Sequence, residues 1–257
     1  MLQQIIEAKR KQLARAQREV PLEELKRRLR GPKDTRSLVQ AIHATKPPAL
    51  IAEIKQQSPS KGILRERFDP ITIARDYQEA GAHALSILTD EPSFGGRLEF
   101  IRDVKQFVEL PILRKDFILE PYQVYESAVA EADALLLIAA ILEQDTLFEL
   151  HRLAASLGLE VVVEVHSEAE LTHALGIQAT LIGINHRDLH TFQLDLSLSG
   201  RLRPHIPAGV TVVAESGIAT PADIQRLRHA EVDAVLIGEA FMVQPDIQRA
   251  VKSLMGW

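Results

Sequence analysis

The sequence has no cysteine among its 257 residues, which excludes disulfides, thiolate metal sites and a cysteine nucleophile. Its apolar stretches are all shorter than the roughly 18 residues that a transmembrane helix needs. Basic residues are not in excess, since 30 Lys and Arg against 35 Asp and Glu give a formal charge of −5. Nucleic-acid binding usually needs a basic domain. We therefore expect a cytoplasmic protein that binds neither nucleic acid nor a membrane.

Residues 2–30 carry the apolar spacing of a helix and are rich in Lys and Arg. The pattern is interrupted at Val20-Pro21, where Pro21 can open a second helical segment, and Gly31-Pro32 is expected to end it. The basic residues predict a solvated helix face, with a membrane-surface role as the alternative.

From residue 49 onward, short apolar stretches of strand type alternate with stretches of amphipathic-helix type. The predicted strands are 49–55, 84–88, 112–115, 134–138, 160–164, 181–185, 211–214 and 234–237. Such an array predicts parallel strands, either in an open doubly wound sheet or in a closed barrel. The units are near-uniform and no GxGxxG fingerprint is present, so we predict an α/β protein with a (β/α)8 TIM barrel. We assign residues 1–45 to an N-terminal helical extension and 46–257 to the barrel, within one domain overall.

Polar residues stand at the ends of seven of these strands. The first ends with Glu53 and Lys55, which strand alternation places on one face. The others lead to Thr89, Asp90, Glu91, Arg114, Lys115, Asp116, Glu164, Asn185, His186, Arg187, Glu215, Ser216, Gly238 and Glu239. In a barrel of this type the loops after the strands build the active site, so we expect these groups to converge on one mouth.

Two glycine turns follow the last two strands, at Gly217 and Gly238. Barrels commonly bind phosphate with these two loops and a short helix, because backbone N–H groups can approach the anion where no side chain intervenes. We therefore predict a phosphate site there, with Lys55 as a candidate cation.

Several segments, taken together and in order, resemble those of the indole-3-glycerol-phosphate synthase family across essentially the whole chain. They are IAEIKQQSPSKG (51–62), ALSILTDEPSFGG (84–96), LPILRKDFILEPYQVYE (110–126), ADALLLIAAIL (132–142), LEVVVEVH (159–166), IGINHRDLHTFQLDL (182–196), VVAESGI (212–218) and DAVLIGEAFM (233–242). The resemblance implies a (β/α)8 barrel with an extra N-terminal helical segment and a reaction that needs no cofactor or metal. The implied substrate is 1-(2-carboxyphenylamino)-1-deoxyribulose 5-phosphate, and the products are indole-3-glycerol phosphate, carbon dioxide and water.

By similarity, Lys115 is the general acid that protonates the ketone oxygen as the new carbon–carbon bond forms. Glu164 and Glu53 are implied to handle proton movement in the later elimination, and Lys55 to supply positive charge. The order of duties among Glu53, Lys55 and Glu164 stays open. The remaining implied substrate contacts are Ser58, Pro59, Phe94, Phe117, Asn185, Arg187, Leu189, Glu215 and Ser216, and the implied phosphate contacts are Lys55, Gly217, Gly238 and Glu239.

Three other interpretations of the polar mouth compete with this one. Glu53, Glu164 and Glu215 could form an oxygen cage for a metal ion, although Lys55 and Lys115 at the same mouth supply the positive charge that a metal would bring. A phosphoribosylanthranilate isomerase, or another phosphosugar isomerase, would share the phosphate loops and release no carbon dioxide. A barrel that only binds a phosphorylated ligand or a partner chain is the third. We expect a monomer, with a weak dimer as the alternative.

Overall fold

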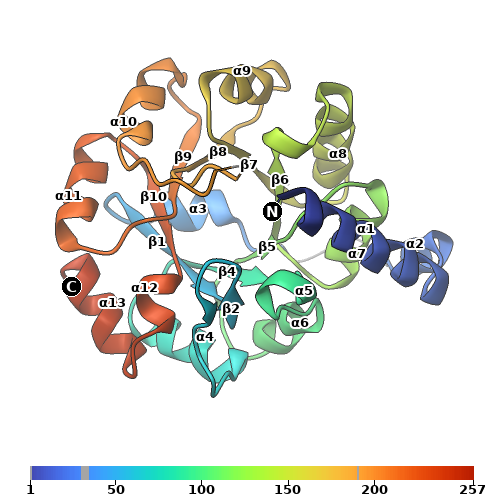
Figure 1. Ribbon diagram of the computed structural model, residues 1–257, viewed down its shortest axis with the longest axis horizontal. Helices are drawn as coiled ribbons and strands as arrows, with labels where there is room; N and C mark the ends of the chain where they lie inside the picture. Colours follow the sequence, from blue (N-terminus) through green and yellow to red (C-terminus); the bar gives the residue numbers. More distant parts are fainter. Residues whose placement is uncertain (1, 30–34, 190) are drawn as a thin grey trace.

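Eight parallel strands close into a barrel in the computed structural model, which describes residues 2–29, 35–189 and 191–257 (Figure 1). The strands are β1 (Ala49–Ile54), β4 (Ala84–Leu88), β5 (Ile112–Lys115), β6 (Ala134–Ile138), β7 (Glu160–Val165), β8 (Leu181–Asn185), β9 (Thr211–Glu215) and β10 (Ala234–Ile237). Each pairs with its neighbour in chain order, and β1 pairs with both β4 and β10 to close the ring. The predicted (β/α)8 barrel is therefore confirmed, with strand ends that differ by one residue at β1, β7 and β9.

Helices alternate with the strands and cover the outside of the barrel (Figure 1). They are α4 (Pro70–Glu79), α5 (Glu91–Phe94), α6 (Glu99–Lys105), α7 (Pro121–Val129), α8 (Gln144–Ser156), α9 (Glu168–Gly176), α10 (Leu198–Leu202), α11 (Pro221–His229), α12 (Glu239–Met242) and α13 (Ile247–Met255), with 3-10 turns η1 (Ala139–Ile141) and η2 (Arg203–His205) and a small hairpin of β2 (Gln57–Ser58) and β3 (Gly62–Ile63). Capping side chains determine where several of these helices begin. Asp69 and Thr220 each accept a backbone N–H at the start of a helix whose first residue is proline.

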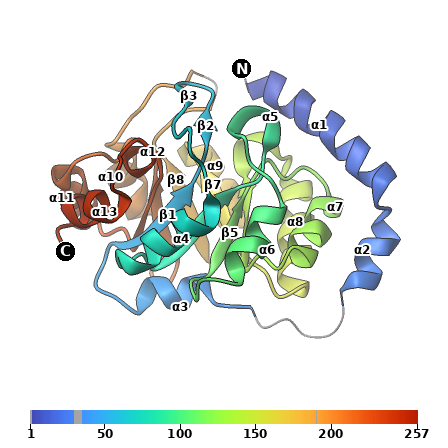
Figure 2. The same ribbon diagram turned by 90° about the horizontal axis from the view of Figure 1, so that it is seen from below.

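The N-terminal extension forms α1 (Leu2–Glu19), α2 (Leu22–Arg28) and α3 (Leu38–His43). Its first break falls at Val20-Pro21, as predicted, whereas the predicted stop at Gly31-Pro32 lies outside the described residues. Figure 2 shows α1 running from the mouth of the barrel down one side, with α3 at the opposite end. The boundary at residue 45 stays a prediction. Within the described ranges, no helix has the length and apolar character required to cross a membrane.

Strand alternation divides the core into two parts. One face of each strand packs against the helices, and the other fills the barrel interior with residues such as Ile51, Leu136 and Leu236. Leu38 and Ile42 of α3 join the interior cluster and are fully buried. The polar ends of the strands are thus left at the other end, which is the mouth.

Candidate active site

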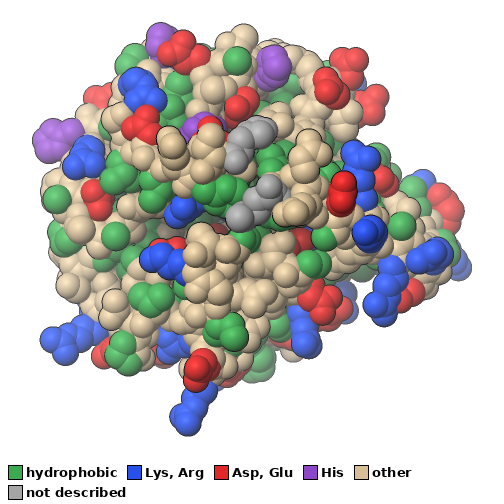
Figure 3. All heavy atoms as spheres, in the orientation of Figure 1, with side chains coloured by type: hydrophobic (Ala, Val, Ile, Leu, Met, Phe, Trp, Pro, Cys, Tyr) green, Lys and Arg blue, Asp and Glu red, His purple; other side chains and the backbone are tan. Residues whose placement is uncertain are grey.

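A cavity of about 490 Å³ occupies the mouth of the barrel. Figure 3 shows the same face, where hydrophobic side chains and side chains of Lys or Arg border a central hollow. All of the predicted site residues line the cavity, although they come from strand ends and loops far apart in the sequence. They are Glu53, Lys55, Ser58, Pro59, Phe94, Lys115, Phe117, Glu164, Asn185, Arg187, Leu189, Glu215, Ser216, Gly217, Gly238 and Glu239. The structure brings them together in one cavity, and their roles are taken up below as proposals.

Lys115 lies between two carboxylates at the centre of the site. Its Nζ is 3.0 Å from Glu164 Oε2 and 3.5 Å from Glu215 Oε2. Burial alone would lower the pKa of Lys115, but the negative charges of Glu164 and Glu215 outweigh it and raise the pKa above its ordinary value. Lys115 is therefore a cation that donates hydrogen bonds into the cavity.

Glu215 is almost completely buried at the end of β9, with 1% of its surface exposed. Burial raises its pKa to about 8, opposed by the charge of Lys115 and reinforced by that of Glu164. Its Oε1 has no hydrogen-bond partner among the described residues. The carboxyl group occupies space that a side chain at Gly183 would fill, so the glycine of β8 is required for this packing.

Glu53 and Lys55 form a second ion pair in the cavity wall, with 2.5 Å between Glu53 Oε2 and Lys55 Nζ. Both point to the barrel interior from the same end of β1, as strand alternation predicts. Tyr77 donates its hydroxyl to the backbone carbonyl of Glu53 and so holds that end of the strand. A side chain at Gly238 would collide with the Glu53 carboxylate, which makes that glycine part of the same packing.

The predicted phosphate end is built by the turns after β9 and β10. Ser216 and Gly217 both have positive φ, 68° and 74°, a conformation that non-glycine residues adopt at a cost. Gly238 precedes α12, whose first residue is Glu239. The Glu239 carboxylate turns outward and pairs with Lys61 of the β2–β3 connection at 2.7 Å.

The opposite side of the cavity is apolar. The rings of Phe94 and Phe117 lie 6.3 Å apart between centroids, and Leu189 packs against the same cluster. The sequence analysis missed Leu2 and Ile5, which come from α1 and complete this wall. Their spacing of three residues indicated an amphipathic helix face, but no local signal told which surface that face would cover.

Arg114, which precedes Lys115, does not follow it into the mouth as expected. Arg114 points out of the barrel, because alternation along β5 places it opposite Lys115. It donates to Asp116 Oδ2 at 2.9 Å and to Glu126 at 2.8 Å. The expectation of one convergent set of polar residues is therefore wrong for Arg114, whereas Asp116 lies at the wall of the mouth cavity.

Lys9 of α1 is also buried, contrary to the predicted solvated face, with 3% of its surface exposed. Its Nζ lies 2.7 Å from Asp90 and 2.6 Å from Asp116. Burial would raise the pKa of Asp116, but the charges of Lys9 and Arg114 hold it well below its usual range. A buried ionic network thus joins α1 to the strand that carries Lys115.

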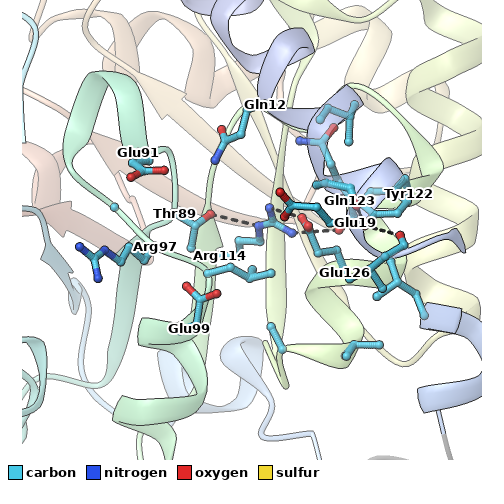
Figure 4. Close-up of a pocket in the computed structure, with 18 of the residues that line it drawn as sticks. Gln12, Glu19, Thr89, Glu91, Arg97, Glu99, Arg114, Tyr122, Gln123 and Glu126 are labelled. Atoms are coloured by element: carbon cyan, nitrogen blue, oxygen red, sulfur yellow. Dashed lines mark hydrogen bonds and ion pairs between the residues drawn. The ribbon is translucent and has the colours of Figure 1, made fainter.

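A second cavity, of about 610 Å³, is lined by residues of α1, α2, α6 and α7 (Figure 4). Arg114 lies in its wall, but every N–H group of its guanidinium already has an acceptor. The acceptors are Thr89, Asp116, Gln123, Glu126 and Ser127. The central cation of this cavity therefore has no free N–H group with which to bind a ligand.

The proposed oxygen cage for a metal does not form. Glu53 is paired with Lys55, and Lys115 lies between Glu164 and Glu215. In the part of the chain that the structure describes, no three His, Asp or Glu side chains stand where they could hold a metal ion. The arrangement instead alternates ammonium and carboxylate groups, which suits proton transfer. Fold and site together define a (β/α)8-barrel protein whose mouth holds paired ammonium and carboxylate groups.

Comparison with known proteins identifies the family. The family model described as indole-3-glycerol phosphate synthase matches residues 2–254. A protein of that name from Rhodopirellula baltica is 44% identical over 255 residues, covering 99% of this chain and 98% of the relative. One from Polaromonas naphthalenivorans is 45% identical over 259 residues, covering 100% and 98%. The chain belongs to the indole-3-glycerol phosphate synthase family, which confirms the resemblance seen in its motifs.

Solved structures of other barrels show the fold alone. KGPDC from Streptococcus mutans superposes with a TM-score of 0.63 at 12% identity, covering 82% of this chain and 97% of that one. A 3-hexulose-6-phosphate synthase superposes with a TM-score of 0.62 at 18% identity, covering 80% and 97%.

Proposed function

We propose that the mouth cavity closes the indole ring of 1-(2-carboxyphenylamino)-1-deoxyribulose 5-phosphate, the reaction that family membership implies for this carboxy-lyase of tryptophan biosynthesis. The observation that carries the proposal is the position of Lys115, held between Glu164 and Glu215 beside an apolar wall. The apolar side of the cavity suits the aromatic ring of the substrate, and the ionic centre suits its ketone. The glycine turns at the far side suit its phosphate.

The first step joins the ring carbon that bears the carboxylate to the ketone carbon. The carbonyl π electrons move to oxygen, and Lys115 donates the proton that makes this oxygen a hydroxyl. Because its neighbours raise the pKa of Lys115, the group keeps its proton until negative charge develops on that oxygen. The bond to the carboxylate then breaks, its electrons return to the ring, and carbon dioxide leaves.

The second step removes the new hydroxyl as water. One group must protonate the departing oxygen while another takes a proton from the substrate. Glu164, Glu53 and Lys55 share these duties in our proposal, since the two carboxylates and the ammonium group line one cavity. Lys55 also attracts the negative charge of the substrate.

The other side chains hold the substrate. Asn185, Arg187, Ser216, Ser58 and Glu215 orient its polar groups. The ring is enclosed by Pro59, Phe94, Phe117 and Leu189, and the phosphate is held by backbone N–H groups of Gly217, Gly238 and Glu239 together with Lys55.

The test is a fluorescence assay of indole formation with the purified full-length chain, run with a chelator and with carbon dioxide measured in parallel. We expect equal amounts of indole product and carbon dioxide, unaffected by the chelator. Turnover without carbon dioxide would favour a phosphosugar isomerase, and binding without turnover would favour a binding protein. We further propose a cytoplasmic monomer, which size-exclusion chromatography at several concentrations distinguishes from a weak dimer.

A further inference from the structure

The loop after β8 carries two of the proposed substrate contacts, Arg187 and Leu189, into the mouth cavity. Arg187 forms an isolated antiparallel bridge with Leu194, so the loop is a narrow hairpin over residues 186–189 and 191–195. Asp188 organises its turn. The backbone N–H of Asp188 donates to the Gln193 carbonyl at 3.0 Å, and its own carbonyl accepts from Phe192 at 2.8 Å.

His166 fastens this hairpin from outside. It follows β7, two residues after Glu164, and its backbone N–H donates to Glu170 at 2.8 Å. Its ring Nδ1 lies 2.6 Å from the backbone oxygen of Asn185, at the base of the hairpin. Its Nε2 lies 3.5 Å from Asp188 Oδ2, at the turn.

The ring therefore lies between two groups that can only accept hydrogen bonds. Because the Asn185 carbonyl cannot donate, Nδ1 must carry a hydrogen. In a neutral ring Nε2 is then a bare acceptor that faces the Asp188 carboxylate. Only the protonated ring can donate to both ends of the hairpin at once.

The titratable groups around the ring come from three elements. Glu164 belongs to β7, Glu170 to α9 and Asp188 to the hairpin, and these three line a cavity of about 130 Å³ beside His166. His186 at the base of the hairpin interacts with the ring through charge. Asp188 is the carboxylate that lies against Nε2, so it is the partner of an imidazolium at this position.

We propose that His166 is a positioning residue whose protonated ring clamps the hairpin and keeps Arg187 and Leu189 in place for the substrate. The inference rests on the proposed function, because that function makes the hairpin part of the binding site. His166 lies behind the hairpin and acts through it. Its loss should weaken substrate binding and leave the chemical step intact.

The decisive experiment measures kcat and KM for the full-length enzyme and for His166→Asn between about pH 6 and about pH 8.5. Asparagine can still donate to the Asn185 carbonyl but cannot reach Asp188. We expect KM of the variant to exceed that of the wild type by about tenfold at the lower pH, with kcat within about twofold. The difference in KM should close as pH rises, because only a protonated imidazole can donate at both of its nitrogens. The matched control is His173→Asn, at an exposed position of α9, which should follow the wild type throughout.

Hydrogen exchange of the free enzyme gives a readout that does not depend on turnover. The amides of residues 191–195 should exchange faster in His166→Asn than in His173→Asn at the lower pH, and equally fast at the higher pH. Equal exchange and equal KM at every pH would overturn the inference, as would a lower kcat at unchanged KM. If the wild type forms no indole, the proposed function fails, while the exchange experiment still decides whether His166 clamps the hairpin.

Discussion

Lys9 Nζ lies 2.6 Å from Asp116 Oδ1, so the first helix of the chain is bonded to the residue that follows Lys115. Both side chains are almost fully buried, with exposed fractions of 4% and 1%. A buried ion pair is costly to break, because removing one partner leaves the other charge without compensation. This ion pair therefore helps to hold α1 against the barrel, and its loss should lower the free energy of unfolding.

We predict that Lys9→Met lowers the free energy of unfolding by about 3 kcal/mol, because Asp90 and Asp116 would remain buried without their shared cation. Urea unfolding at neutral pH measures this. Lys11→Met is the control, since Lys11 is exposed on the same helix, and its effect should stay within about 0.5 kcal/mol. Equal losses in the two variants would contradict a special role for the Lys9 pair.

We predict that Lys115→Ala lowers kcat by at least about a hundredfold, the scale expected for a positioned general acid. Glu164→Gln should fold normally and also turn over slowly. Steady-state kinetics with circular dichroism separates lost chemistry from lost structure. Lys46→Ala, at an exposed position before β1, should retain full activity. An unchanged kcat in either site variant would remove that residue from the proposed mechanism.

Acid should destabilise the protein through His83. Its Nδ1 accepts the Leu50 N–H at 3.1 Å, and burial lowers the pKa of the ring below its ordinary value of 6.5. The unfolded chain therefore binds more protons as pH falls below about 6.5, and the stability that neutral His83 contributes is lost. In His83→Asn, which does not titrate, the free energy of unfolding should fall less between about pH 7 and about pH 5. His205→Asn, at an exposed position, should keep the wild-type pH dependence.

Gly238→Ala should lower kcat/KM by about a hundredfold, since even a small displacement of a catalytic group can cost that much. The new methyl group would collide with the Glu53 carboxylate and displace the ion pair with Lys55. Gly200→Ala is the control, because a side chain there meets nothing within 4 Å among the described residues. Similar kinetics in the two variants would show that the packing of Gly238 on Glu53 does not matter.

The eight strands were predictable because their signals are local. The run 234–237, for example, is apolar and bounded by Asp233 and Gly238, so this strand could be located without knowledge of its neighbours. Proline at the first helical position located α4 and α11 in the same way. The location of the mouth was predictable from the order of the strands and helices, since parallel strands bring their carboxyl ends to the same end of the barrel.

Residues whose partners are distant could not be placed in this manner. Arg114 and Lys115 are adjacent and both basic. The guanidinium of Arg114 makes all of its hydrogen bonds in the second cavity, whereas Lys115 faces the mouth cavity. Alternation predicts that they point to opposite sides, but only the closed barrel decides which side is the interior.

The sequence alone therefore determined the order of strands and helices, the end of the barrel that carries the polar groups, and the family. Tertiary structure decided that Lys9 is buried, that Leu2 completes the apolar wall and that His166 lies against Asp188. The physical reason is the distance along the chain over which each interaction acts. Backbone preference and hydrophobic period act over a few residues, whereas burial and ion pairing depend on segments that meet only when the barrel closes.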